Sequence, residues 1–305
     1  MTRTLQHDCS NGTPGGIVDR DLVRGPRAAI GQFRCPVTCP AFRDTGPIRE
    51  YIVVFPRTGV QIRHEGSRPF LADPTVATIY NRAQRYERFA ASPEGDRCDW
   101  FAVSDEVARE IVGAFDARAA ESDRPFRHAW APTPAALYLR QRALVRRAEA
   151  GQLDACEAEE EAIAIVGEVL AVAHRASPRP ASGARAAARR RELTEAARAE
   201  IYRTVTRNTP VHELAATLGT SPFHLCRVFR ACTGRTMHGY RSELRVRQAV
   251  ELLQSGGATG LSAMAHGLGF ASHSHFVLAM RRHIGATPTH LRRMLTTATA
   301  AGGGD

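Results

Sequence analysis

The sequence predicts an α+β fold: an N-terminal β-rich domain, a helical connector, and a C-terminal all-α domain built from two helix-turn-helix units. Three observations predict it. Short β-type runs separated by turns occupy much of the first hundred residues, one helical pattern occurs twice in the last hundred, and the net positive charge lies in the C-terminal part. A length of 305 residues also suggests two domains.

Runs rich in β-branched and aromatic residues predict short strands between positions 50 and 103. These runs cover residues 51–55, 60–64, 75–80 and 99–103. Pro, Gly, Ser and Asp residues form turn signals between them, at 56–59, 65–69 and 92–96. Several short strands at this spacing predict a small antiparallel barrel or sandwich.

After these strands the pattern changes to helical. Ser104 is a typical N-cap followed by acidic residues, and Val107, Ile111 and Phe115 recur at helical spacing. Residues 133–150 and 154–174 predict two further helices, separated by Gly151. Residues 177–191, with two prolines and an Ala/Arg run, predict a linker because they are poor in core-forming side chains.

The C-terminal part contains the same pattern twice, because residues 212–241 align with residues 262–292. Leu218-Gly219 matches Leu268-Gly269 at an offset of 50 residues. The second copy has one extra residue after this glycine, so the positions that follow match at an offset of 51 residues. Each unit predicts a short helix that ends on Leu-Gly, a turn made by the glycine, and a second helix with a Ser N-cap. The second helices carry apolar pairs that we expect to face inward, Leu225/Phe229 and Phe276/Met280.

These residues resemble the AraC/XylS class of bacterial transcription regulators. The resemblance rests on SPFHLCRVF at 221–229, followed by Gly234 and Tyr240-Arg241, and on Gly269-Phe270, His275-Phe276 and GATP at 285–288. It covers about residues 193–295. The second unit departs from the pattern, because Leu278 stands where the first has Arg227, and Met280 where the family usually shows Phe. The former predicts a lost phosphate or base contact, and the latter a tolerated core exchange.

The resemblance implies a cupin-like β-barrel sensor domain at the N-terminus. It also implies that the predicted helical hairpin forms a dimer interface; the alternative is that the hairpin only packs on the barrel. The predicted boundaries are a disordered tail at 1–20, the β-rich domain at 21–103, the connector at 104–176, the linker at 177–191, the DNA-binding domain at 192–295 and a second disordered tail at 296–305.

The charge distribution favours nucleic-acid binding by the C-terminal part. All 41 basic residues are Arg. Divided at Pro178, the N-terminal part has 23 Arg and 24 acidic residues, whereas the C-terminal part has 18 Arg and 7 acidic residues. The respective net charges of −1 and +11 account for the total of +10. Segregated positive charge of this kind neutralises DNA phosphates.

The N-terminal turns of the two predicted second helices supply the candidate DNA contacts, because this part of a recognition helix enters the major groove. Arg227 suits guanine or a phosphate, and Phe223 suits a thymine methyl group. His273 and His275 point about 200° apart on a helix, so we expect only one of them to face DNA. The complete set is Ser221, Pro222, Phe223, Cys226, Arg227, Ser272, His273, Ser274 and His275.

Three thiols and an imidazole in the N-terminal domain raise a second hypothesis, a zinc site. Cys35 and Cys39 have a Cys-x3-Cys spacing, and Cys98 and His64 complete a tetrahedral donor set. The alternative is that these are unrelated buried thiols. Seven Cys without a secretory signal argue against a disulfide framework.

The expected function is that of a sequence-specific regulator of transcription that responds to a signal at its N-terminal domain. The expected partners are double-stranded DNA, a second copy of the chain, a small-molecule effector and, for an activator, RNA polymerase. The alternative is a constitutive DNA-binding protein whose N-terminal domain only dimerises. We expect no enzyme activity, because His64 is the only His between residues 49 and 103 and metal-dependent cupins need more ligands. Without a membrane-spanning run or a signal-peptide core, we expect a cytoplasmic protein and no membrane partner.

Overall fold

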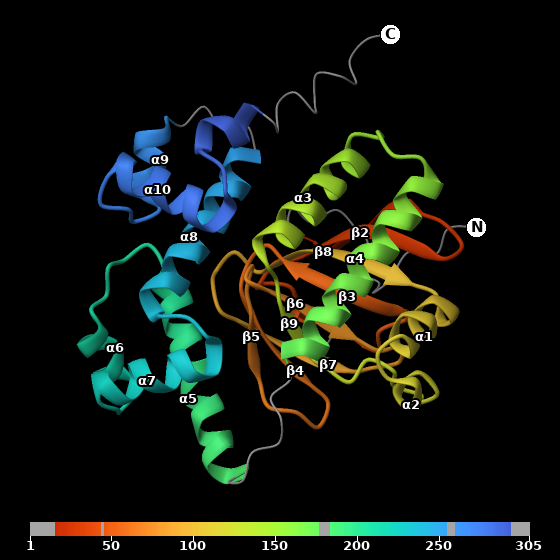
Figure 1. Cartoon of the computed structure of the whole chain (residues 1–305), viewed down its shortest axis with the longest axis horizontal. Helices are drawn as coiled ribbons and strands as arrows, with labels where there is room; N and C mark the ends of the chain where they lie inside the picture. Colours follow the sequence, from red (N-terminus) through yellow and green to blue (C-terminus); the bar gives the residue numbers. More distant parts are fainter. Residues whose placement is uncertain (1–15, 44–45, 177–183, 255–259, 294–305) are drawn as a thin grey trace. The chain divides into compact units, whose positions relative to one another are not determined.

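The computed structural model describes residues 16–43, 46–176, 184–254 and 260–293. The chain divides into two compact units, Met1–Ser177 and Pro178–Asp305 (Figure 1). Most of the predicted N-terminal tail, the predicted C-terminal tail and the first part of the predicted linker lie outside the described residues. Within the described residues, no helix is both long and apolar enough to cross a membrane.

The N-terminal unit contains two antiparallel sheets, one with the strand order β1-β2-β8-β3-β6-β9 and the other with the order β5-β4-β7. Their strands are β1 (Val18–Arg24), β2 (Ala28–Cys35), β3 (Tyr51–Pro56), β4 (Val60–His64), β5 (Phe70–Ala72), β6 (Val76–Tyr80), β7 (Tyr86–Ala90), β8 (Asp96–Val103) and β9 (Trp130–Pro132). The predicted β-rich architecture is confirmed. The two sheets are not hydrogen-bonded into one closed barrel among the described strands.

The central strands explain which side chains enter the core. Strand β8 pairs over its whole length with β2, from Ala28 opposite Val103 to Cys35 opposite Asp96, and it also pairs with β3. Because successive side chains of a strand point to opposite faces, alternate residues face a helical layer or the three-stranded sheet. Phe101, for example, is fully buried in the core that includes the helices.

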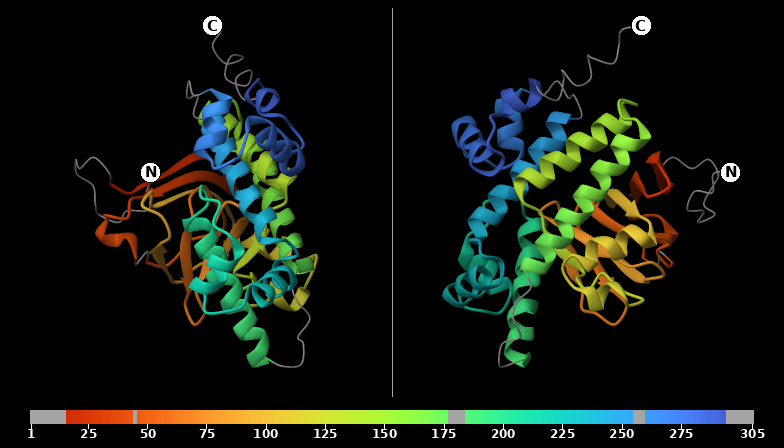
Figure 2. Two further views of the ribbon diagram at one scale, coloured as in Figure 1. Left: turned by 90° about the vertical axis from the view of Figure 1, so that its left-hand side faces the viewer. Right: turned by 45° about the vertical axis from the view of Figure 1, so that its right-hand side comes forward.

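Helices cover one face of the six-stranded sheet. They are α1 (Asp105–Gly113), α2 (Ala117–Ala120), α3 (Ala135–Glu149) and α4 (Ala155–Ala176). In Figure 2, α3 and α4 lie side by side, and α4 contacts β2, β8 and β9. Their apolar residues, such as Val145, Ile165 and Val169, are buried in the same core as the sheet. The predicted hairpin therefore packs on the β-domain, and the interactions of Ser104 at the start of α1 include the expected N-cap bond from Val107.

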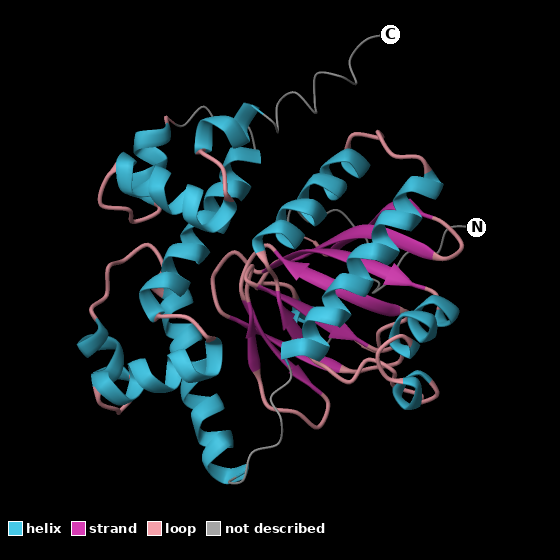
Figure 3. Cartoon of the chain, viewed as in Figure 1, coloured by secondary structure: helices cyan, strands magenta, loops and turns pink. Residues whose placement is uncertain are grey.

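The C-terminal unit is all helical over its described residues (Figure 3). Its helices are α5 (Ala184–Arg203), α6 (Val211–Thr217), α7 (Pro222–Thr233), α8 (Met237–Gln254), α9 (Leu261–Gly267) and α10 (His273–Ile284). Helices α6 and α7 form the first helix-turn-helix unit, α9 and α10 form the second, and α8 joins them. The predicted double helix-turn-helix architecture is confirmed.

Two predicted boundaries differ from the structure. Strand β1 begins at Val18, inside the predicted tail, and α5 begins at Ala184, inside the predicted linker. The sequence of β1 is VDRDLVR, and its charged residues interrupt the alternation of apolar and polar side chains that usually indicates a strand. The strand forms because its backbone pairs with β2 as the edge of the sheet. The Ala/Arg run before residue 192 is a helix because both residue types favour one.

Candidate nucleic-acid interface and ligand cavity

The two recognition helices begin with the same backbone arrangement. Ser221 Oγ accepts a hydrogen bond of 3.2 Å from His224 N, and Ser272 Oγ accepts one of 3.1 Å from His275 N. Each bond satisfies an N–H group that the first turn of a helix leaves without a partner. The predicted N-caps are confirmed at both positions.

Glycines make the turns that precede these caps. Gly219 and Gly269 have φ angles of +62° and +82°, in the left-handed region that favours glycine. At Gly269 a Cβ atom would also overlap the carbonyl oxygen of Thr206. The second turn therefore needs glycine for both its conformation and its close contact.

The apolar pairs on α7 and α10 hold these helices on the domain core. Leu225, Phe229, Phe276 and Met280 are all fully buried, as the aligned pattern predicts. Because residues four apart lie on one face of a helix, the opposite face of each recognition helix stays in solvent.

The solvent-exposed faces carry the predicted DNA contacts. His275 is half-buried. The other predicted contacts are exposed, namely Ser221, Pro222, Phe223, Cys226, Arg227, Ser272, His273 and Ser274. The His275 ring packs edge-on against Phe270, with 5.5 Å between the ring centroids. Of the two histidines, His273 is therefore the one that remains open to a partner.

Each recognition helix also exposes a large apolar side chain. Phe223 on α7 is 78% exposed, and Leu278 on α10 is 65% exposed. Exposed side chains of this size cost solvation free energy unless a partner covers them. On α10, Leu278 shares its face with Ser274 one turn earlier and Arg282 one turn later. Both apolar groups thus lie on the solvent-exposed faces of α7 and α10.

One buried arginine links the segment after α5 to the second helix-turn-helix unit, and sequence reasoning missed it. Arg245 on α8 donates to the carbonyl oxygens of Val205 and Gly269 at 2.7 Å each, and to that of Arg207 at 3.0 Å. Val205 and Arg207 follow α5, whereas Gly269 is the turn of the second unit. Burial lowers the pKa of Arg245 to about 10, so the guanidinium stays protonated at neutral pH. Part of the positive charge in this domain is therefore structural.

The structure does not bring the predicted zinc ligands together. Within the described ranges, no three His, Cys, Asp or Glu side chains form a group that could hold a metal ion, so Cys35, Cys39, Cys98 and His64 do not form a ligand set. His64 instead packs its ring against aromatic neighbours, with centroid distances of 4.8 Å to Tyr80 and 5.5 Å to Phe70, and of 6.5 Å to Tyr86. Burial in this apolar cluster lowers the pKa of His64 to about 4.

The N-terminal unit contains a cavity of about 730 Å³, which the sequence did not predict. Both sheets line it, and most of its wall is apolar. The apolar and aromatic lining includes Phe33, Ile52, Val54, Val60, Ile62, Ala72, Tyr80, Tyr86 and Trp100. A cavity of this size and lining is typical of a site for a small organic ligand.

Trp100 is positioned in this cavity by the residues beside it. Its indole Nε1 donates a hydrogen bond of 3.0 Å to Asp19 Oδ1. Gly31 lies opposite Trp100 in the register of β2 and β8, and a Cβ atom at Gly31 would overlap the indole ring. Glycine at this position thus allows the ring to cover β2 and to reach β1.

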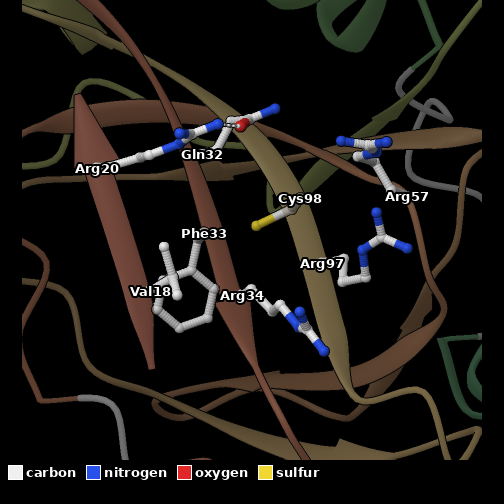
Figure 4. Close-up of a pocket in the computed structure, with 8 residues that line it drawn as sticks. All are labelled: Val18, Arg20, Gln32, Phe33, Arg34, Arg57, Arg97 and Cys98. Carbon is white, nitrogen blue, oxygen red and sulfur yellow. Dashed lines mark hydrogen bonds between the residues drawn. The ribbon is translucent and has the colours of Figure 1, made fainter. Parts of the chain in front are cut away.

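A second hollow of about 200 Å³ lies beside the first, and both touch Phe33 and Cys98. Its lining includes Arg20, Arg34, Arg57 and Arg97 (Figure 4). Arg20 donates a hydrogen bond of 2.8 Å to Gln32, drawn as the dashed line in that view. Arg34 and Arg97 are directly opposite each other on β2 and β8. Of the two hollows, the larger one is better suited to an organic ligand because of its volume and apolar wall.

Comparison with known proteins places the similarity in the C-terminal domain. Residues 214–294 match a family model described as a helix-turn-helix domain. Eighty residues are 38% identical to the HTH-type transcriptional regulator GlxA of Rhizobium meliloti, which is 26% of this chain. The matched part spans 24% of the length of that relative.

Two solved structures show some similarity to this chain. ToxT from Vibrio cholerae is 13% identical over 83% of this chain and 92% of its own, with a TM-score of 0.35. An AraC-type DNA-binding domain-containing regulator from Chromobacterium violaceum is 25% identical over 35% of this chain and 96% of its own, with a TM-score of 0.33.

Proposed function

We propose that this chain, whose residues 214–294 match a helix-turn-helix family model and resemble the AraC/XylS class, is a sequence-specific, DNA-binding regulator of transcription whose N-terminal domain responds to a small molecule. The observation that carries the proposal is the pair of recognition helices, each capped by Ser, held by a buried apolar pair and open to solvent on its other face. DNA in a bacterium lies in the cytoplasm, so we place the protein there.

The proposed DNA contacts are of three chemical kinds: to base edges, to thymine methyl groups and to phosphates. Arg227 is the candidate for a base or phosphate contact, because a guanidinium donates to guanine or to phosphate oxygens. Exposed Phe223 is the candidate for a thymine methyl group. The exposed residues Arg230, Arg281 and Arg282 lie further along the same helices and suit the phosphate backbone.

Regulation requires that a signal favour one arrangement of the protein over another. A ligand changes DNA occupancy only to the extent that it binds the two arrangements with different affinities. The cavity of about 730 Å³ in the N-terminal unit gives such a ligand a place to bind. This cavity favours a responsive regulator over a constitutive DNA-binding protein with a purely dimerising N-terminal domain. The proposed partners are therefore duplex DNA and an effector, together with a second copy of the chain and, for an activator, RNA polymerase.

Selection of duplexes from a random pool by the full chain tests this function. We expect an enriched site with two sequence-specified segments. At the segment bound by α7, replacing a contacted thymine with uracil removes only the methyl group, and should weaken binding of the wild type more than that of Phe223→Ala. Failure to enrich any sequence would contradict the proposed function.

A further inference from the structure

Five of the eight charged residues that line the large cavity are paired with one another. Arg88 donates to Asp96 at 2.7 Å, and Arg24 donates to Asp21 at 2.6 Å and to Glu50 at 2.9 Å. Four acidic and four Arg residues occur in the lining, so their formal charges balance. The protein itself therefore neutralises most of the charge at this wall.

Among the four carboxylates of the lining, Asp19 differs from the other three. Its Oδ1 accepts the Trp100 hydrogen bond, whereas its Oδ2 is buried without any hydrogen-bond partner. A buried carboxylate oxygen without a partner raises the free energy of the folded state, because no protein hydrogen bond replaces the hydrogen bonds to water that it has lost. Burial is the main reason that the pKa of Asp19 is raised to about 6; the Trp100 hydrogen bond opposes this increase, Asp21 adds to it, and Arg24 and Arg49 oppose it.

We propose that the cavity binds an apolar molecule that carries an amine, with the amine donating to Asp19 and the apolar body contacting Trp100 and the facing aliphatic side chains. This inference rests on the proposed function, because it names the class of effector for that domain. It is carried by the cavity's volume, its apolar lining and the single unpaired carboxylate oxygen.

The geometry favours an amine over an acid or a sugar. A cationic N–H donor forms a charge-assisted bond to the carboxylate, and this bond is stronger than one between neutral groups. A carboxylic acid would place a second negative charge beside Asp19 and Asp21. A sugar would need several hydrogen-bond partners, whereas the wall around Trp100 is formed mainly by side chains such as Ile52 and Val54.

The chain offers an internal reporter for this site. It has two Trp residues, and Trp130 is 37% exposed. The variant Trp130→Phe of the full chain therefore leaves Trp100, in the cavity wall, as the sole indole fluorophore. A compound that enters the cavity should change its emission.

Titration with three compounds of one skeleton tests the proposal: adamantylmethylamine, adamantylmethanol and adamantanecarboxylic acid. All three share an apolar cage and lack aromatic rings, so their own absorption does not obscure a change in Trp100 emission. We expect the amine to bind with an affinity at least about ten-fold higher than the other two, a ratio typical of hydrogen bonds to charged groups. Equal or tighter binding of the acid, or no binding of the amine, would overturn the proposal.

Two matched variants assign the contact to one carboxylate, with binding measured by calorimetry. Asp19→Asn should weaken amine binding about ten-fold or more and leave the alcohol unchanged. Asp21→Asn makes the same chemical change two residues away, at a carboxylate already paired with Arg24, and should have a smaller effect. Equal losses in both variants would mean that general negative charge, not Asp19, attracts the amine. If Asp19→Asn fails to fold, the three-compound comparison on the wild type still decides the outcome.

The result is separable from the proposed function. Binding of the enriched duplex is measured on the same protein without any added compound. Intact DNA binding with no amine binding would overturn only the ligand class, whereas amine binding without sequence-specific DNA binding would overturn only the regulator.

Discussion

The indole of Trp100 on β8 donates a hydrogen bond of 3.0 Å to Asp19 on β1, and the ring passes over Gly31 on β2. Strand β2, which carries Gly31, lies between the strands of the two hydrogen-bonded residues. The absence of a side chain at Gly31 lets one aromatic ring span this central strand. The polar end of the cavity thus depends on three strands in register.

Replacing Gly31 with Ala should disturb this arrangement. The new methyl group overlaps Trp100, so the ring must move and the Asp19 hydrogen bond is lost. We expect a loss of about 1–3 kcal/mol in the free energy of unfolding, as for other overpacked core positions. Urea denaturation measures it. As a control, Gly167→Ala in α4 should be neutral or stabilising, because its Cβ would meet only Ile111 at 3.9 Å and alanine favours helix. Equal losses in both variants would contradict this explanation.

The buried imidazole of His64 should make the N-terminal domain sensitive to acid. Its pKa is about 4 in the folded protein and near 6.5 in the unfolded chain, so only the unfolded state gains a proton as the pH falls from 6.5 towards 4. This contribution to stability is complete above pH 6.5 and decreases below it. His64→Phe preserves a ring in the aromatic cluster and removes the titration.

Unfolding measured at pH 8 and pH 5 checks this prediction. Between these values the wild type should lose about 2 kcal/mol more than His64→Phe. Asp19 acts in the opposite direction, because its raised pKa favours the folded state at low pH, and it is present in both proteins. The exposed His212 provides the control, since His212→Gln should behave as the wild type. The same pH dependence in His64→Phe and the wild type would refute the prediction.

Arg245 should be needed for the second helix-turn-helix unit to keep its place in the domain. Arg245→Met retains much of the apolar stem but leaves the carbonyl oxygens of Val205, Arg207 and Gly269 without this donor. We expect a destabilisation of about 2–4 kcal/mol, because several buried acceptors lose a charged donor together. Thermal unfolding measures it. Arg281→Met, at an exposed position on α10, should leave the melting temperature nearly unchanged and weaken DNA binding instead.

Arg227→Ala should weaken binding of the enriched duplex by about 1–3 kcal/mol if the guanidinium contacts a base. Fluorescence anisotropy at fixed salt measures the affinity. The control is Arg175→Ala, which removes one positive charge from an exposed position on α4 in the N-terminal unit. If both variants bind the enriched duplex equally, Arg227 has no specific role. If Arg227→Ala weakens enriched and random duplexes equally, it contacts phosphate.

Local signals made the C-terminal domain predictable from sequence. Ser221 and Ser272 are recognisable N-caps, and the glycines before them mark turns, because both effects depend on neighbouring residues along the chain. Arg245 gave no such signal. Its role depends on the fold, which brings Val205 after α5 and Gly269 in the turn of the second unit close to the same side chain. The periodicity of the sequence does not predict this contact.

The N-terminal domain was less predictable because its features come from strand pairing. Strand β1 is a charged edge strand, and the cavity needs Asp19, Trp100 and Gly31 in register. The predicted zinc ligands are not brought together for a related reason. The Cys35 and Cys39 spacing suggests metal binding, but the position of His64 in an aromatic cluster is a property of the folded sheets.

The central claim is that α7 and α10 read one duplex as a bipartite site, and a hydroxyl-radical footprint of the full chain on the enriched duplex tests it most directly. We expect two protected segments whose centres are about 34 Å apart, one turn of DNA. The segment bound by α7 should tolerate fewer base changes, because Arg227 and Phe223 both lie there whereas α10 has Leu278 in the position equivalent to Arg227. Binding should also fall at least about ten-fold between 50 and 200 mM salt. A single protected segment, or sequence sensitivity only in the segment bound by α10, would contradict the account.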